Sequence, residues 1–423
     1  MTRPTASTSS STRNFRRSKS ASRTSASAVT STSNQGRLTV KLKINRDKLA
    51  EIVTRGVSSA PKNSPAIIAN NARIIAEDGM LHVATTDFQM QVEASGECEL
   101  SRKGSTTVDA AKLKQVVDRL PKGADVTIDF DEAKFEMIVK AGRSRTSFPT
   151  LAAEDWPARQ YKEDGATFTL DGADLVKLFS HTAQELSTVP NSAMQGVFFH
   201  VANGRLAAVG TTGMILIMSS VPLPEGAEDM PQDGSGRPGV ILSAETVSQI
   251  LRLFRSAEEV QIVVNEHSIF VSTPTTRFCS SLLLGTYPNY TPLVSNPCDT
   301  RIKLEREACA SAVALLEPFA LKDQGYRLQC AGSDEGFVVA VGSQTGGGVD
   351  VVEADINGEI AAFGLNGQFM KTMLGSFKAS TIQMHPDHQN RRVLFQAEDE
   401  PSMIGVIGMM NISTEMAAGP THD

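Results

Sequence analysis

The chain has 423 residues and a mass of 45.3 kDa, enough for about three domains that each bury a core. Hydrophobic residues make up 40% and charged residues 21%, and no apolar run approaches the ~18 residues of a membrane-spanning helix, so no membrane partner is expected. Five cysteines without a C-x-x-C pair argue against a disulfide framework and a thiolate zinc site, and they fit a reducing cytoplasm. One Trp and four Tyr argue against aromatic platforms for single-stranded nucleic acid.

The N-terminal segment, residues 1–36, differs in composition from the rest of the chain. It contains six Lys or Arg, no acidic residue and 18 Ser or Thr, whereas the rest has 35 basic and 47 acidic residues. Such a tract cannot bury enough apolar surface to offset the entropy lost on ordering, so we expect a disordered, solvated tail. Its Arg-rich, Ser-rich and acid-free pattern leaves two alternatives open, an organelle transit peptide and an arm that binds nucleic acid.

Residues 37–412 repeat one hydrophobic pattern three times. In each copy a short amphipathic helix is followed by a hairpin, a second helix and further alternating strands. The hairpin turns are Asp78-Gly79, Asn203-Gly204 and Glu335-Gly336. The apolar residues of the first helices are Leu49, Ile52 and Val53; Leu175, Leu178 and Phe179; and Cys309, Ala312, Val313 and Leu316.

The second helix of each copy gives the clearest evidence for the repeat. A side-chain cap stands four residues before the first apolar residue, and the apolar residues follow at i, i+3, i+4 and i+7. The three sets are Asp109 with Leu113, Val116, Val117 and Leu120; Ser243 with Val247, Ile250, Leu251 and Phe254; and Asn366 with Met370, Met373, Leu374 and Phe377. Three such stripes in register predict whole domains of about 125 residues rather than solenoid units.

The repeat predicts an α+β fold in which each domain packs two helices on antiparallel sheets. The expected segments are a tail at 1–36, domains at 37–160, 161–297 and 298–412, and a C-terminal tail at 413–423. An open antiparallel sheet leaves unpaired amides at its edges, and pairing with the next domain satisfies them until a ring closes. Because the chain has an odd number of domains, we expect a head-to-tail homodimer.

The second helices are more basic than the rest of the acidic chain. They carry Lys112, Lys114, Arg119, Arg252, Arg255, Lys371 and Lys378 against only Asp109, Asp118 and Glu245. For one helix alone, a solvated charged face is the simpler interpretation. The same bias in three equivalent helices favours a surface for a polyanion, with phosphate contacts to duplex DNA that do not depend on its sequence.

Several strings occur in a fixed order along residues 37–412. They are Ala84-Thr85-Thr86-Asp87-Phe88-Gln89-Met90, Gly142-Arg143-Ser144-Arg145, Ser147-Phe148-Pro149-Thr150-Leu151, Glu154-Asp155-Trp156-Pro157 and Gly285-Thr286-Tyr287-Pro288-Asn289-Tyr290. With the threefold repeat, they resemble the bacterial sliding clamp, the β subunit of DNA polymerase III. The resemblance implies three tandem repeats of the DNA-clamp fold in a head-to-tail dimer, a ring around duplex DNA that a clamp loader opens with its own ATP. It implies a cytoplasmic, nucleoid-associated processivity factor that is not an enzyme and has no cofactor.

The resemblance also implies a groove between the second and third domains. There, DNA polymerase and clamp-loader subunits would dock short peptides, mostly Gln-Leu and apolar-aromatic. Matched residue by residue, the groove would use Met194, Thr211, Gly213, Met214, Ile215, Leu216, Pro288, Leu293, Val406, Ile407, Met409 and Met410. A Met-rich wall suits a site that accepts several partners. Without the resemblance, core residues at a domain junction would be the simpler interpretation.

Three stretches depart from the family pattern. The chain has Thr212-Gly213-Met214-Ile215-Leu216 where the family usually has Asp-Gly-His-Arg-Leu, and Gly408-Met409-Met410-Asn411-Ile412 where it has Met-Pro-Met-Arg-Leu. Both changes remove positive charge and polar donors from the groove. Of the family's basic DNA-contacting loop near the first hairpin, only Lys62 remains, and we expect it to face DNA.

Enzyme classes find little support in the sequence. His385 and His388 flank Pro-Asp, which predicts a hairpin turn rather than a metal site. Gly346-Gly347-Gly348 lacks the Lys-Ser/Thr of a phosphate loop and predicts a flexible turn between strands. No G-x-S-x-G elbow occurs, and no placed base indicates a catalytic centre. A three-domain interaction scaffold that does not encircle DNA is the remaining alternative.

Overall fold

The computed structural model describes residues 40–61, 63–131, 134–159, 162–295, 297–343 and 346–412. The predicted tails at 1–36 and 413–423 and the predicted DNA contact Lys62 lie outside the described residues. Within the described part, no helix is long and apolar enough to cross a membrane.

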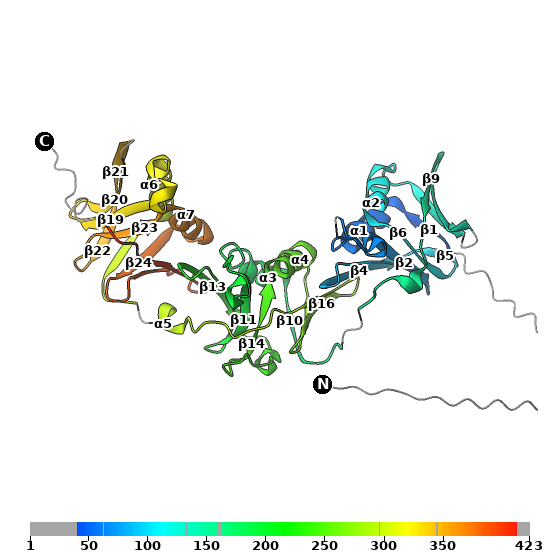
Figure 1. Ribbon diagram of the computed structural model, residues 1–423, viewed down its shortest axis with the longest axis horizontal. Helices are drawn as coiled ribbons and strands as arrows, with labels where there is room; N and C mark the ends of the chain where they lie inside the picture. The colour runs from blue at the N-terminus through cyan, green and yellow to red at the C-terminus, as the bar shows by residue number, and fades with distance from the viewer. Residues whose placement is uncertain are drawn as a thin grey trace, which may run out of the picture. The chain divides into compact units, whose positions relative to one another are not determined.

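The described chain repeats one α+β unit three times, as the sequence predicts (Figure 1). The first repeat holds β1 (Lys41–Asn45), α1 (Arg46–Gly56), η1 (Ile67–Asn70), β2 (Asn71–Glu77), β3 (Met80–Thr86), β4 (Met90–Glu97), β5 (Glu99–Arg102), β6 (Gly104–Asp109), α2 (Ala110–Arg119), β7 (Asp125–Asp131), β8 (Glu136–Ala141), β9 (Ser144–Pro149) and η3 (Ala153–Asp155). The second holds β10 (Ala166–Leu170), α3 (Gly172–Phe179), η4 (Ala193–Gln195), β11 (Gly196–Ala202), β12 (Arg205–Thr211), β13 (Ile215–Pro222), η5 (Ala227–Asp229), β14 (Gly239–Ser243), α4 (Ala244–Phe254), β15 (Val260–Val264), β16 (Ser268–Thr273), β17 (Thr276–Ser281) and α5 (Thr291–Val294). The third holds β18 (Arg301–Glu305), α6 (Arg306–Leu316), η6 (Glu317–Phe319), η7 (Lys322–Gln324), β19 (Arg327–Ser333), β20 (Gly336–Ser343), β21 (Gly346–Val352), β22 (Ala354–Asn357), β23 (Phe363–Asn366), α7 (Gly367–Ser376), β24 (Thr381–Asp387), β25 (Arg392–Gln396) and β26 (Met403–Gly408).

The predicted caps begin the second helix of every repeat. The Asp109 carboxylate accepts a hydrogen bond from the Lys112 amide at 2.8 Å, and the Ser243 hydroxyl accepts one from the Thr246 amide at 3.1 Å. The Asn366 side-chain oxygen accepts from the amides of Gln368 and Phe369. Each cap satisfies helix amides that would otherwise lack a partner, which is why the sequence pattern locates these helices correctly.

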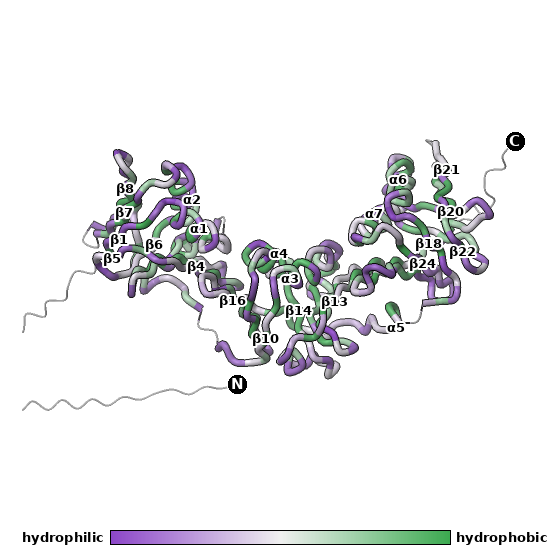
Figure 2. The backbone as a smooth tube through the Cα atoms, turned by 180° about the vertical axis from the view of Figure 1, so that it is seen from behind, coloured by the Kyte–Doolittle hydropathy of each residue, from purple (hydrophilic) through white to green (hydrophobic). Residues whose placement is uncertain are grey.

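Each repeat has its own hydrophobic core beneath its two helices. The first helices bury their predicted apolar residues, and the strands supply the opposite wall. Strands such as β13 and β14 are largely hydrophobic along their length (Figure 2), because both of their faces are covered. A fourth, smaller cluster lies where the second repeat meets the third.

Two sheets run continuously from one repeat into the next. β4 pairs antiparallel with β17, from Met90 opposite Ser280 to Ala94 opposite Thr276, and β13 pairs in the same way with β26. In both cases a strand of one repeat joins the final strand of the following repeat. Edge pairing between domains is therefore present in the chain, as the sequence argument expects.

The corresponding strands β21 and β9 are the outer strands of their sheets. Among the described strands, β21 pairs only with β20, and β9 pairs only with β8. Among the described strands, the internal pattern thus leaves one open strand edge in the third repeat and one in the first.

One turn prediction from the sequence is wrong, and another is displaced along the chain. Gly346-Gly347-Gly348 opens the strand β21, where a Cβ on Gly347 would collide with the Val341 carbonyl oxygen, so the glycines permit close strand packing. The hairpin expected around His385 and His388 is present, but strand β24 extends through Pro386 to Asp387, so its turn occupies residues 388–391. His385 is held in this strand region by a contact between its Nδ1 and the Thr300 carbonyl oxygen at 3.1 Å.

Candidate functional site

An apolar cavity of about 390 Å³ lies where the second repeat meets the third. Its walls come from the turn between β12 and β13, the segment before α5, and the strands β25 and β26. The lining residues are Met194, Thr211, Gly213, Met214, Ile215, Leu216, Tyr287, Pro288, Asn289, Tyr290, Leu293, Asn390, Arg391, Arg392, Val406, Gly408 and Met409. We call this cavity the junction groove. It contains every groove residue expected from the sequence except Ile407 and Met410.

The register between β13 and β26 explains the floor of the junction groove. Leu216 lies opposite Val406, and both belong to the small cluster between the repeats. Their neighbours Ile215 and Ile407 also lie opposite one another, but their side chains pack in the core of the third repeat. Successive strand residues point to opposite faces, so the Ile407 side chain packs in the core and is absent from the groove lining. Ile215 packs in the same core but still borders the groove, because it is the first residue of β13, next to the turn that forms the rim.

Met410 is displaced from the groove by its backbone pairing. Its amide donates to the Gly364 carbonyl at 2.8 Å, and its methyl group lies close to Gly325. Met410 therefore packs within the third repeat, whereas the adjacent Met409 lines the groove.

The turn after β12 presents Met214 at the rim. The Thr211 hydroxyl donates to the Ile215 carbonyl at 2.7 Å and accepts from the Gly213 amide at 2.9 Å. Gly213 has φ +93°, a conformation that glycine adopts without a steric penalty. Met214 is left 50% exposed, while its carbonyl accepts from the Gly408 amide at 2.8 Å. A large apolar side chain is thus held in solvent beside the groove, as is the 41% exposed Leu293.

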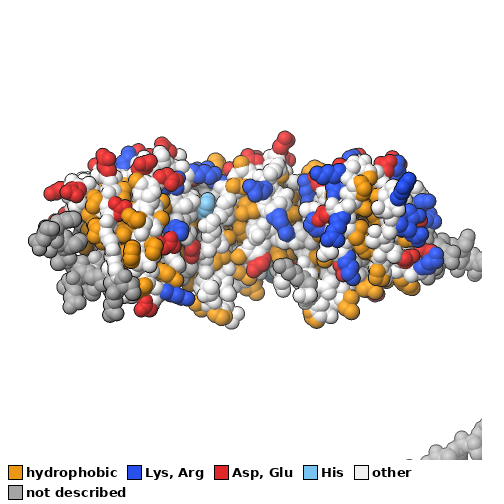
Figure 3. Space-filling view, turned by 90° about the horizontal axis from the view of Figure 1, so that it is seen from above, with side chains coloured by type: hydrophobic (Ala, Val, Ile, Leu, Met, Phe, Trp, Pro, Cys, Tyr) orange, Lys and Arg blue, Asp and Glu red, His pale blue; other side chains and the backbone are white. Residues whose placement is uncertain are grey.

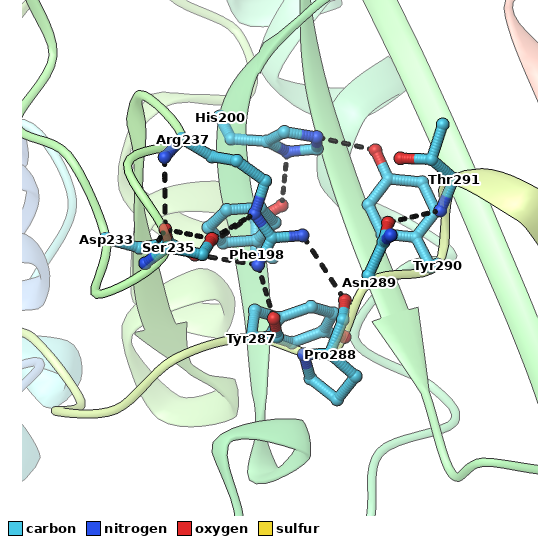
Figure 4. Close-up of polar contacts among 10 residues, drawn as sticks. All are labelled: Phe198, His200, Asp233, Ser235, Arg237, Tyr287, Pro288, Asn289, Tyr290 and Thr291. Carbon is cyan, nitrogen blue, oxygen red and sulfur yellow. Dashed lines mark hydrogen bonds and ion pairs between the residues drawn. The ribbon is translucent and has the colours of Figure 1, made fainter.

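A polar frame supports the wall formed by Tyr287 and Pro288 (Figure 4). The Arg237 guanidinium donates to the carbonyl oxygens of both residues, the contact to Pro288 being 3.4 Å long. The Asp233 carboxylate accepts from Arg237 Nη2 at 2.7 Å. Asp233 and Arg237 lie outside the sequence strings on which the family resemblance rests.

Tyr290 is fixed from behind by a buried histidine (Figure 4). His200 is 2% exposed, its Nδ1 lies 3.3 Å from the Phe198 carbonyl oxygen, and its Nε2 lies 2.6 Å from the Tyr290 hydroxyl. Because a carbonyl can only accept, Nδ1 donates and Nε2 accepts the tyrosine proton. Burial lowers the pKa of His200 to about 4 and raises that of Tyr290 to about 12, so both are neutral near pH 7.

This histidine predicts a pH-dependent stability. His200 takes up a proton at about pH 6.5 when unfolded but only at about pH 4 when folded, so its contribution to folding is present above pH 6.5 and is lost as the pH falls. Between pH 7 and pH 5 the free energy of unfolding should drop by about 2 kcal/mol through this group. Urea unfolding at both pH values should show a smaller drop for His200→Gln. The exposed His267→Gln is the control and should behave as the parent, and equal drops in all three would contradict the assignment.

The third repeat contributes two arginines that the sequence analysis does not predict. Arg392 is 5% exposed and donates to the Pro292 carbonyl at 2.6 Å and to the Asp387 carboxylate at 3.2 Å, so it holds the segment of α5 against β25. Arg391 is exposed at the groove and donates to the Asn411 side-chain oxygen at 2.7 Å. The stretches 212–216 and 408–412 lack the positive charge that the family usually has there. Arg391, which precedes β25, supplies a positive charge at this rim instead.

Several cations of the second helices have partners within the chain. Lys114 pairs with Asp118 at 2.8 Å and Lys371 with Glu317 at 2.8 Å, while Lys112 lies 3.8 Å from Asp109. These three ion pairs reduce the charge that the helices offer to a polyanion.

Arg252 makes an unexpected contact between repeats. It donates to the Ser58 carbonyl just beyond α1, and Gln249 donates to the same oxygen at 2.9 Å. This arginine therefore ties the second repeat to the first.

The remaining predicted cations are Arg119, Arg255 and Lys378. All three are exposed, and no ion pair is found for their side chains among the residues that the structure describes. On the face drawn in Figure 3, Lys and Arg side chains gather mainly over the first repeat, and acidic side chains are interspersed elsewhere. The charge bias expected from the sequence is thus uneven among the repeats.

Comparisons with known proteins find a family match and relatives for this chain. Residues 40–160 match the family described as DNA polymerase III beta subunit, N-terminal domain. The beta sliding clamp of Caulobacter vibrioides (strain NA1000 / CB15N) is 27% identical over 343 residues, which cover 79% of this chain and 90% of the relative.

Solved structures share the fold over most of the chain. A beta sliding clamp from Caulobacter crescentus superposes with a TM-score of 0.82 at 24% identity and covers 89% of this chain and 100% of its own. A sliding clamp from Bartonella birtlesii bound to griselimycin superposes with a TM-score of 0.81 at 22% identity, over 88% of this chain and 100% of its own. The resemblance and the fold expected from the sequence are confirmed.

Proposed function

We propose that this chain, a divergent relative of the beta sliding clamps, is a non-catalytic sliding clamp. As a head-to-tail homodimer it encircles duplex DNA and tethers a DNA polymerase, which docks a short peptide in the junction groove. The observation that carries the proposal is the likeness to beta sliding clamps along nearly the whole of the described chain, at both the sequence and the fold level.

The internal ladders support ring closure. If β21 pairs with β9 of a second copy as β4 pairs with β17 and β13 with β26, two copies close a ring of six repeats without leaving these edges open. The charges are complementary, because β9 carries Arg145 beside Arg143 of its turn, whereas β21 carries Asp350 and is followed by Glu353.

The junction groove supports the docking role. Its apolar floor and exposed rim side chains suit a Leu or Phe of a partner peptide, worth roughly 1.5–3 kcal/mol for each fully buried side chain. Arg391 at the rim suits a carboxylate of the partner, so the preferred peptide combines apolar residues with an acidic one.

Retention on DNA tests the proposed function directly. The clamp, loaded onto nicked circular DNA, should remain bound after gel filtration and should leave when a single cut linearises the DNA. Equal retention on both forms, or on neither, would favour the scaffold that does not encircle DNA. Nuclease and ATPase activity should be absent throughout.

Charge reversal at the exposed helix cations should weaken retention. Replacing Arg119, Arg255 and Lys378 by Glu removes contacts to phosphates and hence the counterions that they release. Retention falls as salt rises, and the slope of log retention against log salt should become less steep by roughly 2 to 3. The control is Arg277→Glu. Arg277 lies on the strand β17, where it pairs with Glu163, and its replacement should leave the slope unchanged. An unchanged slope in the triple variant would show that these helices do not face DNA.

A further inference from the structure

A short loop before β14, residues 231–238, carries three polar side chains toward the wall of the junction groove (Figure 4). The loop is closed by a hydrogen bond from the Asp233 amide to the Arg237 carbonyl at 2.8 Å and by an isolated bridge between Gln232 and Pro238. Gly236 has φ +79°, which allows the tight turn. The loop is thus a compact unit that holds its side chains in defined places.

Asp233 is the centre of this unit. Its carboxylate accepts from the Ser235 hydroxyl at 2.6 Å, from the Ser235 amide at 2.8 Å and from Arg237 Nε and Nη2 at 3.2 and 2.7 Å. Its side chain is 3% exposed. Burial alone would raise the pKa of Asp233, but the hydrogen bonds from Ser235 and Arg237 outweigh burial and lower it to about 2. The carboxylate is therefore ionised at neutral pH and fixes the orientation of the guanidinium.

Arg237 connects this unit to the groove. It donates to the Tyr287 and Pro288 carbonyl oxygens, and its guanidinium carbon lies 4.9 Å from the centroid of the Phe198 ring. Phe198 in turn stacks on Tyr287 with 4.9 Å between centroids and 9° between planes. The residues from 286 to 290 belong to no helix or strand. Arg237 therefore supplies hydrogen bonds to the carbonyl oxygens of Tyr287 and Pro288, which in a β-sheet would come from a neighbouring strand.

We propose that Arg237 is a positioning residue that pre-forms the Tyr287–Pro288 wall of the junction groove for the partner peptide. The inference rests on the proposed docking role of that groove. Arg237 is not required to touch the peptide, since its nitrogens already donate to the wall carbonyls, to Asp233 and to Ser235. A wall ordered before binding raises affinity because the peptide does not bear the entropy of ordering it.

Peptide titrations of Arg237 variants test the inference. Fluorescence anisotropy with a labelled peptide that carries Gln-Leu followed by Leu-Phe should show about tenfold weaker binding to Arg237→Gln, because charge-assisted hydrogen bonds to the wall are lost. Arg237→Lys should restore part of the affinity, since Lys keeps the charge but cannot span both carbonyls. Arg277→Gln removes an arginine paired with Glu163 outside the groove and should bind as the parent does.

Hydrogen exchange separates positioning from simple stabilisation. In the absence of peptide, the amides of residues 286–293 should exchange several times faster in Arg237→Gln than in the parent, while the core amides of the second repeat keep their protection. Ser235→Ala, which removes one donor to Asp233 and one partner of Arg237, should give a smaller change in the same segment. It serves as the readout if Arg237→Gln does not fold.

The outcomes are distinguishable. Unchanged exchange in both variants would overturn the inference, as would weaker peptide binding without faster exchange, because Arg237 would then contact the peptide directly. A general loss of protection with no Lys rescue would also overturn it. If the parent fails to bind the peptide while segment 286–293 still loosens in the variant, the docking role fails and the positioning role of Arg237 stands.

Discussion

Replacing Met214 by Asp is expected to weaken binding of the Gln-Leu and Leu-Phe peptide by at least about 100-fold, or roughly 3 kcal/mol. Met214 is 50% exposed at the rim of the groove, so the substitution does not disturb the core. In the complex, however, the new carboxylate would be buried against an apolar peptide side chain without a partner. Anisotropy titration of the same labelled peptide measures the effect.

The matched control for this experiment is Ile67→Asp. Ile67 is 74% exposed and belongs to η1 of the first repeat, outside the residues that line the groove. It should leave peptide affinity unchanged, and both variants should keep the parent's mass in solution. Parent-like affinity in Met214→Asp would refute the groove as the docking site.

Replacing Val349 and Val351 together by Asp should convert the dimer into monomers. Both valines are exposed on the edge strand β21, at 43% and 39%, and they lie beside Asp350. The double substitution would remove the apolar burial of two valines and would desolvate two carboxylates between paired strands, so the dissociation constant should rise by about 100-fold or more. Light scattering at micromolar concentration should show the parent near twice 45.3 kDa and the variant near that mass.

The control for the dimer is Val189→Asp, at a 61% exposed valine of the second repeat. It should remain dimeric. The double variant should still bind the peptide as the parent does, because the junction groove lies within one chain. A parent that is monomeric, or a double variant that stays dimeric, would refute pairing through β21.

Local signals in the sequence located the helices well. Asp109, Ser243 and Asn366 act through amides two or three residues away, and the apolar stripes repeat at helical spacing, so both features are visible in a short window. The glycine run at β21 was misread, because its role depends on the approach of Val341 from a neighbouring strand. The expected domain boundaries remain predictions.

The groove was only partly accessible to sequence reasoning. The floor residues Leu216 and Val406 follow from the family resemblance, but the expectation for Ile407 is wrong because the interdomain register decides which face it occupies. Arg237 and Arg391 reach the groove from a loop and a strand end that are distant in sequence and carry no motif. Such contacts depend on tertiary packing, which a linear pattern does not specify.

The ladder between β13 and β26 couples ligand occupancy to the integrity of the molecule. Since the floor of the groove is built from both repeats, a bound peptide favours the state in which the two remain joined, and separation of the repeats abolishes the site. Binding and junction stability therefore raise one another by the same factor. In the proposed ring, a partner held in this groove would reinforce the seam between the second and third repeats, so opening would be favoured at a seam that no peptide spans.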